Sequence, residues 1–174
     1  SFYTPTRIIF GAGTLKRVGE EARKFGQKAL VVTGKGSSKK SGSLDEVANS
    51  LISNDVRVEL FNRVEPDPSV ETVEEGAKFA QKCDVDVVIG LGGGSAMDAA
   101  KAIALLMTNK GKISDYFGMD RVKVAALPVI AIPTTAGTGS EVTKYAVVTE
   151  IEKKLKQLIG SNHISPKLAI LDPF

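Results

Sequence analysis

The chain has 174 residues, of which 43% are hydrophobic and 25% charged, and its net charge is +3. This length fits one globular domain or at most two small ones, and the composition is that of a chain with a packed core. The 23 basic residues are interspersed with 20 acidic ones, which does not favour a nucleic-acid-binding protein. No apolar run approaches the roughly 18 residues of a membrane-spanning helix, so we expect no membrane partner.

The cysteine content and the N-terminal residues indicate the cellular compartment. The single cysteine, Cys83, excludes an internal disulfide and indicates a reducing, cytoplasmic setting. The opening stretch SFYTPTRIIFG lacks the apolar core of a signal peptide. We therefore expect a cytoplasmic protein.

Apolar periodicity predicts alternating strands and helices as far as Ile132. The expected strands are 8–10, 29–32, 56–62, 86–92 and 129–132, and the expected helices are 14–26, 41–55, 69–83 and 95–109. Ser43 and Glu46 have the spacing of a capping box at the start of the second helix. The remainder differs, because it contains three short strand-like stretches, 144–150, 154–161 and 167–174, with no long helix between them.

This order of elements predicts an α/β fold. Apolar strands that alternate with helices form a Rossmann-like parallel sheet with helices on both faces, joined by right-handed crossovers. The three strand-like stretches near the C-terminus predict a hairpin or small mixed β extension. We assign the whole chain, 1–174, to one domain.

Three of the expected strands end in unusual loops: TGKGSSKKSG, GLGGGSAMD and PTTAGTGSE. Ligands of open parallel sheets bind beyond the carboxyl ends of the strands, and all three loops are expected at that edge. Their coincidence is a stronger signal than any one of them.

The loop GLGGGSAMD brings bare backbone to the start of a helix. Gly93 and Gly94 carry no Cβ, so the N–H groups and the positive end of the helix dipole can face an anion such as a pyrophosphate. The G-x-G-x-x-G and P-loop patterns are both absent. Ser95 and Asp98 also have capping-box spacing, and the alternative is a tight turn that packs a helix on a strand.

The other two loops favour phosphate and ribose contacts. PTTAGTGSE offers the hydroxyls of Thr134, Thr135, Thr138 and Ser140 beside glycines that allow close approach, although an irregular connector with local hydrogen bonds is the alternative. TGKGSSKKSG carries Gly34 where an NAD site places an acid for the ribose diol. Its cationic and hydroxyl groups suit an adenosine 2′-phosphate, and they include Ser37, Ser38 and Lys39. A solvated basic loop is the alternative.

Taken together, GGGSAMDAAKA and IPTTAGTGSEVT carry a resemblance over essentially the whole chain. The sequence resembles the N-terminal half of the iron-containing (group III) alcohol dehydrogenases. The resemblance implies a nucleotide-binding α/β domain, followed in the family by an all-helical domain, and hydride transfer between NAD(P) and a small alcohol or aldehyde.

The resemblance also implies roles for individual residues. Gly93, Gly94 and Ser95 match the family's pyrophosphate turn, and Asp98 matches its acid on the nicotinamide side. The remaining matched positions contact adenine, phosphate or ribose, and they are Asp67, Thr134, Thr135, Thr138, Val147 and Lys156. Gly34 stands where NAD-preferring members carry Asp, which favours NADP over NAD.

The resemblance leaves the catalytic metal unaccounted for. The family holds Fe²⁺ or Zn²⁺ with one Asp and three His of its helical domain, whereas the only histidine here is His163. We therefore expect no metal ligand and no catalytic residue in this chain, and no turnover by the chain alone. Two alternatives stay open: a stand-alone nucleotide-binding module, and a fragment of a glycerol dehydrogenase-like relative. A cleft wall without its covering domain also predicts self-association.

Overall fold

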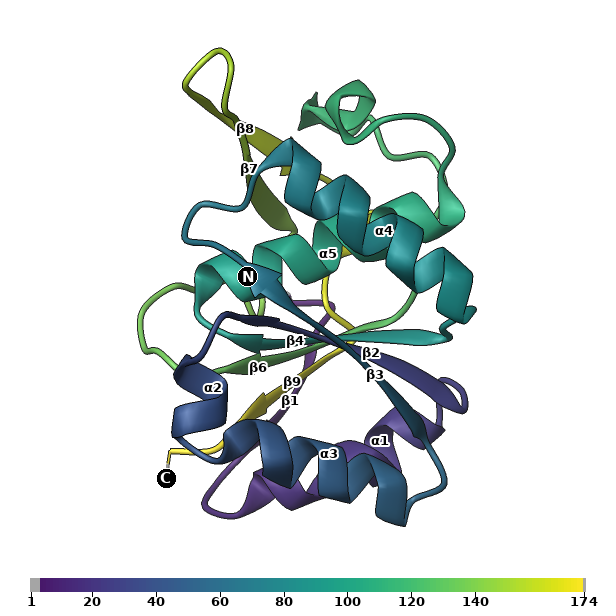
Figure 1. The fold of residues 1–174 in the computed structure, drawn as a ribbon, viewed down its shortest axis with the longest axis vertical. Helices are drawn as coiled ribbons and strands as arrows, with labels where there is room; N and C mark the ends of the chain where they lie inside the picture. The colour runs from purple at the N-terminus through teal and green to yellow at the C-terminus, as the bar shows by residue number, and fades with distance from the viewer. Residues whose placement is uncertain (1–3, 174) are drawn as a thin grey trace.

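The computed structural model describes residues 4–173, except the side chain of Ser37. The main feature is a six-stranded sheet in which every pairing is parallel, with the order β1-β9-β6-β4-β2-β3 (Figure 1). Its strands are β1 (Arg7–Phe10), β2 (Lys28–Gly34), β3 (Arg57–Val64), β4 (Val87–Gly92), β6 (Val129–Pro133) and β9 (Leu168–Leu171).

Helices cover both faces of this sheet (Figure 1). One face carries α4 (Val70–Cys83) and α5 (Gly94–Thr108), and the other carries α1 (Val18–Arg23) and α3 (Ser43–Ser53). The short helices are η1 (Thr14–Arg17), α2 (Ser37–Lys40), η2 (Ile113–Tyr116) and η3 (Asn162–Ile164). The predicted fold class is confirmed.

The central strand β4 shows why the sequence folds this way. All six of its residues are buried, and consecutive side chains point to opposite faces. Val88 joins the hydrophobic cluster on the α4 and α5 side, while Val87 and Ile89 join the cluster on the α1 and α3 side. Such two-sided burial accounts for the unbroken apolar run.

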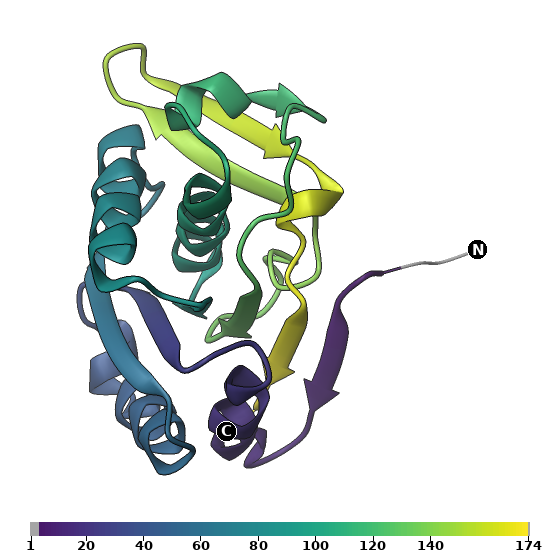
Figure 2. The ribbon, with the colours of Figure 1, turned by 90° about the vertical axis from the view of Figure 1, so that its right-hand side faces the viewer.

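A second, three-stranded sheet lies over α5 (Figure 2). Its order is β5-β8-β7, in which β7 (Tyr145–Glu150) and β8 (Leu155–Gly160) form an antiparallel hairpin and β5 (Gly118–Met119) runs parallel to β8. Its buried side chains Ala146, Val148 and Ile159 belong to the same cluster as the apolar face of α5. This sheet is the predicted β extension.

Two local predictions are wrong. The stretch 167–174 was expected in the extension, but β9 returns to the main sheet and lies between β1 and β6. The Ser43–Glu46 capping box is also absent, because α3 begins after Gly42, which has a φ of 81° and no side-chain cap. In the described part of the chain, no helix has both the length and the apolar character needed to cross a membrane.

Candidate functional site

The three glycine-bearing loops meet at one edge of the main sheet. Strands β2, β4 and β6 are neighbours and run parallel, so their carboxyl ends lie side by side. The Thr134 N–H donates to the Gly92 carbonyl at 2.9 Å, which joins the loop after β6 to the loop after β4. Figure 1 shows helix α2, which follows β2, on the same side of the sheet. The predicted convergence of the loops is therefore present.

The start of α5 offers bare backbone to this edge. Gly93 is the N-cap residue in an extended conformation, and no side chain caps the helix. Gly92 has a φ of 145°, a conformation that L side chains rarely adopt. The N–H groups of the first helical turn lack a side-chain acceptor, and with the positive end of the dipole they favour an anion.

The loop after β6 lies directly against this turn. A Cβ built on Gly93 would be 3.3 Å from Thr135 Oγ1, and a Cβ on Gly94 would be 3.5 Å from Thr138 Cβ. Side chains at the two glycines would therefore fill the space between turn and loop. The structure brings together four of the residues matched to pyrophosphate and adenosine contacts: Gly93, Gly94, Thr135 and Thr138.

Ser95, Asp67 and Lys156 form a second group at the same edge. Ser95 Oγ accepts a hydrogen bond from the Asp67 N–H at 3.1 Å. Asp67 Oδ1 lies 2.7 Å from Lys156 Nζ, and both of these side chains are largely exposed. Asp67 and Lys156, which lie 28 and 61 positions from Ser95 in sequence, thus come together with it at this edge, and the cofactor contacts implied for all three stay predictions. The predicted capping role of Ser95 is wrong, because its hydroxyl accepts from the backbone of the loop before α4 and no side chain caps α5.

Asp98 also does not cap α5. Its Oδ1 accepts from Ser140 Oγ at 2.5 Å, and its Oδ2 accepts from the Val147 N–H at 3.0 Å. Asp98 therefore ties α5 to the loop after β6 and to β7. Asp98 and Val147, which the resemblance matches to separate cofactor positions, are thus joined through the backbone of Val147, and their cofactor contacts stay predictions.

Lys101, one helical turn beyond Asp98, was not among the predicted site residues. Its side chain is 0% exposed, and its Nζ donates to Ser140 Oγ at 2.8 Å and to the Tyr145 carbonyl at 2.7 Å. Asp98 Oδ1 lies 3.6 Å away. Burial lowers the pKa of Lys101 from 10.5 to about 8, although Asp98 and Glu141 act to raise it. A lysine inside the apolar run AAKAIALL was the available signal.

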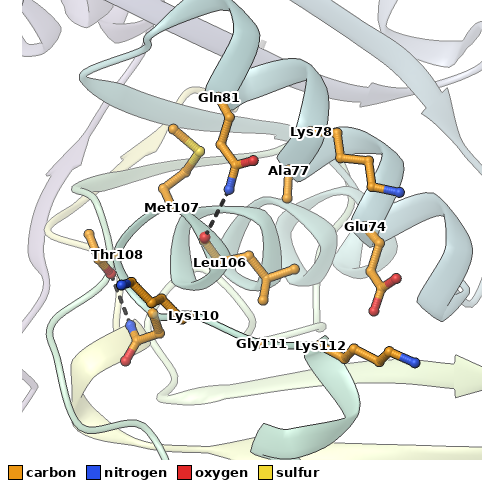
Figure 3. A pocket seen from close by; sticks show the side chains of 11 residues that line it. Glu74, Ala77, Lys78, Gln81, Leu106, Met107, Thr108, Lys110, Gly111 and Lys112 are labelled. Atoms are coloured by element: carbon orange, nitrogen blue, oxygen red, sulfur yellow. Dashed lines mark hydrogen bonds between the residues drawn. The ribbon is translucent and has the colours of Figure 1, made fainter.

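One surface hollow lies at this edge of the sheet and a larger one lies away from it. The smaller hollow, about 270 Å³, lies at the ends of β2, β3 and β4 and is lined by Gly34, Lys35, Val64, Glu65, Pro66, Gly92, Gly93, Ser95 and Ala96. The larger hollow, about 540 Å³, lies between α4 and the segment after α5 (Figure 3). There Gln81 donates to the Leu106 carbonyl, and the glycine loops are not involved. The smaller hollow is part of the candidate site, because the bare backbone of Gly92 and Gly93 and the residues that follow β2 and β3 border it.

The cofactor-binding residues predicted at the end of β2 and in the loop after it differ in burial and in their distance from the hollow. Gly34 borders the 270 Å³ hollow, and Lys39 is exposed on α2. Ser38 is 1% exposed, accepts from Thr33 Oγ1 at 2.8 Å and faces the Leu91 carbonyl, so in this conformation it holds the loop together. The side chain of Ser37 is outside the described residues. Cofactor contacts by Gly34, Ser37, Ser38 and Lys39 stay predictions.

The structure also bears on metal ligands. Among residues 4–173, no group of three or more His, Cys, Asp and Glu side chains is placed to hold a metal ion. His163 is exposed in η3, and its N–H donates to Ser161 Oγ at 3.2 Å.

Comparison with known proteins identifies the family. The sequence model described as iron-containing alcohol dehydrogenase matches residues 5–173. The chain belongs to this family. Among curated relatives, alcohol dehydrogenase 4 of Saccharomyces cerevisiae is 40% identical over 173 residues, which are 99% of this chain and 45% of the relative. The chain thus spans about 45% of the length of that relative.

Solved structures of the family share the fold. The NADH-dependent butanol dehydrogenase A of Thermotoga maritima superposes with a TM-score of 0.93 at 37% identity, covering 99% of this chain and 44% of the other. A sulfoacetaldehyde reductase of Bifidobacterium kashiwanohense, solved in complex with NAD⁺, superposes with a TM-score of 0.87 at 33% identity, covering 99% of this chain and 46% of the other. The resemblance read from the two loop motifs is confirmed.

Proposed function

We propose that this chain is the dinucleotide-binding domain, residues 1–174, of an oxidoreductase that transfers hydride between NADP(H) and a small alcohol or aldehyde. The observation that carries the proposal is the meeting of the loops after β2, β4 and β6 at the uncapped start of α5. Gly92, Gly93 and Gly94 leave backbone there that a diphosphate can approach. The residues present therefore fit a dinucleotide.

Each part of the edge has a role in this proposal. The N–H groups at Gly93, Gly94 and Ser95 hold the diphosphate, and the hydroxyls of Thr134, Thr135 and Thr138 contact phosphate and adenosine. Val147 and Lys156 line the cofactor from the second sheet, where Lys156 exchanges its bond with Asp67 for one with the ribose. Asp98 lies on the nicotinamide side. The bound cofactor supplies the hydride chemistry, and the protein binds and orients it.

The choice of NADP over NAD rests on the hollow beside Gly34. Lys35 lines it, and Glu65 is the one carboxylate among its described lining residues. Burial acts to raise the pKa of Glu65, but hydrogen bonds from Ser69 and Thr72 hold it below the usual value. Glu65 thus stays ionised but already has partners, so it is a poor acceptor for a ribose diol. Two relatives are named for NADH or NAD⁺, and NAD is the competing cofactor.

A fluorescence titration of the chain with NADPH and NADH tests this choice. We expect NADPH to bind at least fivefold more tightly, and we expect G34D to reverse the order by supplying an acceptor for the ribose diol. The variant fits the structure, because a Cβ on Gly34 would meet only the Val64 carbonyl, at 3.5 Å. G36D is the matched control, since a Cβ on Gly36 meets nothing within 4 Å. Equal affinity for both nucleotides would contradict the NADP assignment, and no binding would contradict the proposed function.

We further propose that the chain binds the cofactor but does not turn over alcohol by itself, and that it acts in the cytoplasm. A bound Fe²⁺ or Zn²⁺ would supply Lewis-acid chemistry at the alcohol oxygen, whereas the residues proposed here bind and orient the nucleotide. Incubation with NADP⁺, a series of short alcohols and either metal is expected to give no NADPH absorbance. Steady turnover would show that the chain holds a complete active site. Tight nucleotide binding without turnover fits both this proposal and a stand-alone module.

A further inference from the structure

The cluster around Lys101 lies directly behind the cofactor edge. Lys101 and Asp98 come from α5, Ser140 from the loop after β6, and Tyr145 from the start of β7. The Lys101 ammonium donates to Ser140 Oγ and to the Tyr145 carbonyl, and Ser140 Oγ in turn donates to Asp98. One buried ammonium on α5 therefore holds two positions that lie 39 and 44 residues further along the chain.

The cluster continues to the phosphate turn through a short series of contacts. The Ser140 N–H lies 3.4 Å from its acceptor, Thr138 Oγ1. Thr138 in turn is the side chain that a Cβ on Gly94 would meet, at 3.5 Å. The position of Lys101 therefore bears on where Thr138 lies relative to the start of α5.

Fold stability alone does not explain an ammonium at this position. Removing a charge from water is unfavourable, and an apolar side chain of similar volume often serves a buried site as well or better. A methionine would fill the space without that penalty, but it would leave Ser140 and the Tyr145 carbonyl without their donor. What the lysine adds is a fixed geometry for the loop after β6.

We propose that Lys101 is a positioning residue for cofactor binding: through Ser140 it fixes the loop 134–140 against the start of α5. Lys101 does not contact the cofactor, because its side chain is fully buried. This role rests on the proposed function, since the loop and the turn that it fixes are the proposed phosphate seat.

The test uses K101M in the full chain, with K78M on the exposed surface of α4 as the matched control. We expect the NADPH dissociation constant to rise at least tenfold in K101M and to stay within twofold of wild type in K78M. Amide hydrogen exchange in loop 134–140 is expected to accelerate at least tenfold, while the amides of β4 keep their protection. Unchanged affinity, or exchange that accelerates equally in β4, would overturn the positioning role.

S140A gives a second route if K101M does not fold. It removes the hydroxyl between ammonium and carboxylate and leaves the apolar core intact. We expect it to weaken NADPH binding about as much as K101M, and K101M/S140A to be no weaker than K101M. Additive losses would show that Lys101 acts by another route. If wild type binds neither nucleotide, the proposed function fails, and the exchange experiment still decides whether Lys101 fixes the loop.

Discussion

At the scale of single residues, the buried Lys101 makes stability depend on pH. Burial lowers its pKa from 10.5 to about 8, whereas the unfolded chain keeps the ordinary value. Between these values the unfolded state binds more protons, so the free energy of unfolding rises with pH. This gain in stability is complete above pH 10.5 and is lost as the pH falls through the folded pKa of about 8. A shift of this size corresponds to about 3 kcal/mol.

Urea unfolding of wild type and K101M between pH 7.5 and 10 measures this contribution. The difference, wild type minus K101M, is expected to grow in favour of wild type as the pH rises. Other groups that titrate there, such as Cys83, whose pKa burial raises, contribute equally to both proteins and cancel. If the free energies of unfolding of the two proteins changed in parallel with pH, Lys101 would keep its ordinary pKa in the folded state.

The same residue shows how far single positions could be read from sequence. Gly93 and Gly94 were found because three successive glycines between an apolar strand and a helix have few explanations other than close approach of a ligand. Lys101 was missed because its partners, Ser140 and Tyr145, lie 39 and 44 residues away. Local pattern carries no information on such contacts, and Ser95 and Asp98 were assigned to capping for the same reason.

At the scale of elements, Gly76 lets α4 and α5 pack closely. A Cβ on Gly76 would clash with Ile103 Cδ1 and lie 3.2 Å from Phe61 Cε1. G76A gains up to about 1 kcal/mol in helix propensity but overpacks the core by about 1–3 kcal/mol. We expect the net change to be destabilising, by about 1 kcal/mol.

Thermal and urea unfolding measure the effect of G76A, and G76V is expected to destabilise further because it adds two methyl groups at the same contact. K78A is the control, since it changes helix propensity at an exposed position of α4. If G76A were more stable than wild type, Ile103 would have enough freedom to move aside, and propensity would decide the sign.

Elements were predictable where one pattern dominates. The apolar runs of β2, β4 and β6 are buried on both faces, so their type and shared edge followed from the sequence. Which sheet β9 joins did not follow from the sequence, because its four apolar residues, Leu168–Leu171, would suit either sheet. Long-range pairing with Arg7–Phe10 decides it, and a short strand carries no signal of its partner.

At the scale of the whole molecule, the layers explain the position of the candidate site. Helices α1 and α3, the main sheet, helices α4 and α5, and the small sheet follow one another (Figures 1 and 2). The carboxyl edge of the main sheet and the outward strands β7 and β8 thus both reach the start of α5. Asp98 and Lys156 come from these different layers, which is why one linear motif could not reveal the complete site.

The open edge of the main sheet predicts self-association. β1 is the terminal strand, and Phe10 on it is 74% exposed, with Ile8 exposed beside it. An edge strand with apolar side chains can pair with another chain. We expect the mass measured by sedimentation equilibrium to rise with concentration in the micromolar range and F10K to shift the equilibrium at least tenfold toward monomer. I52K is the control, because Ile52 is 62% exposed on α3. An unchanged mass over the whole range would contradict self-association, and equal effects of the two variants would show that net charge, not the β1 edge, governs it.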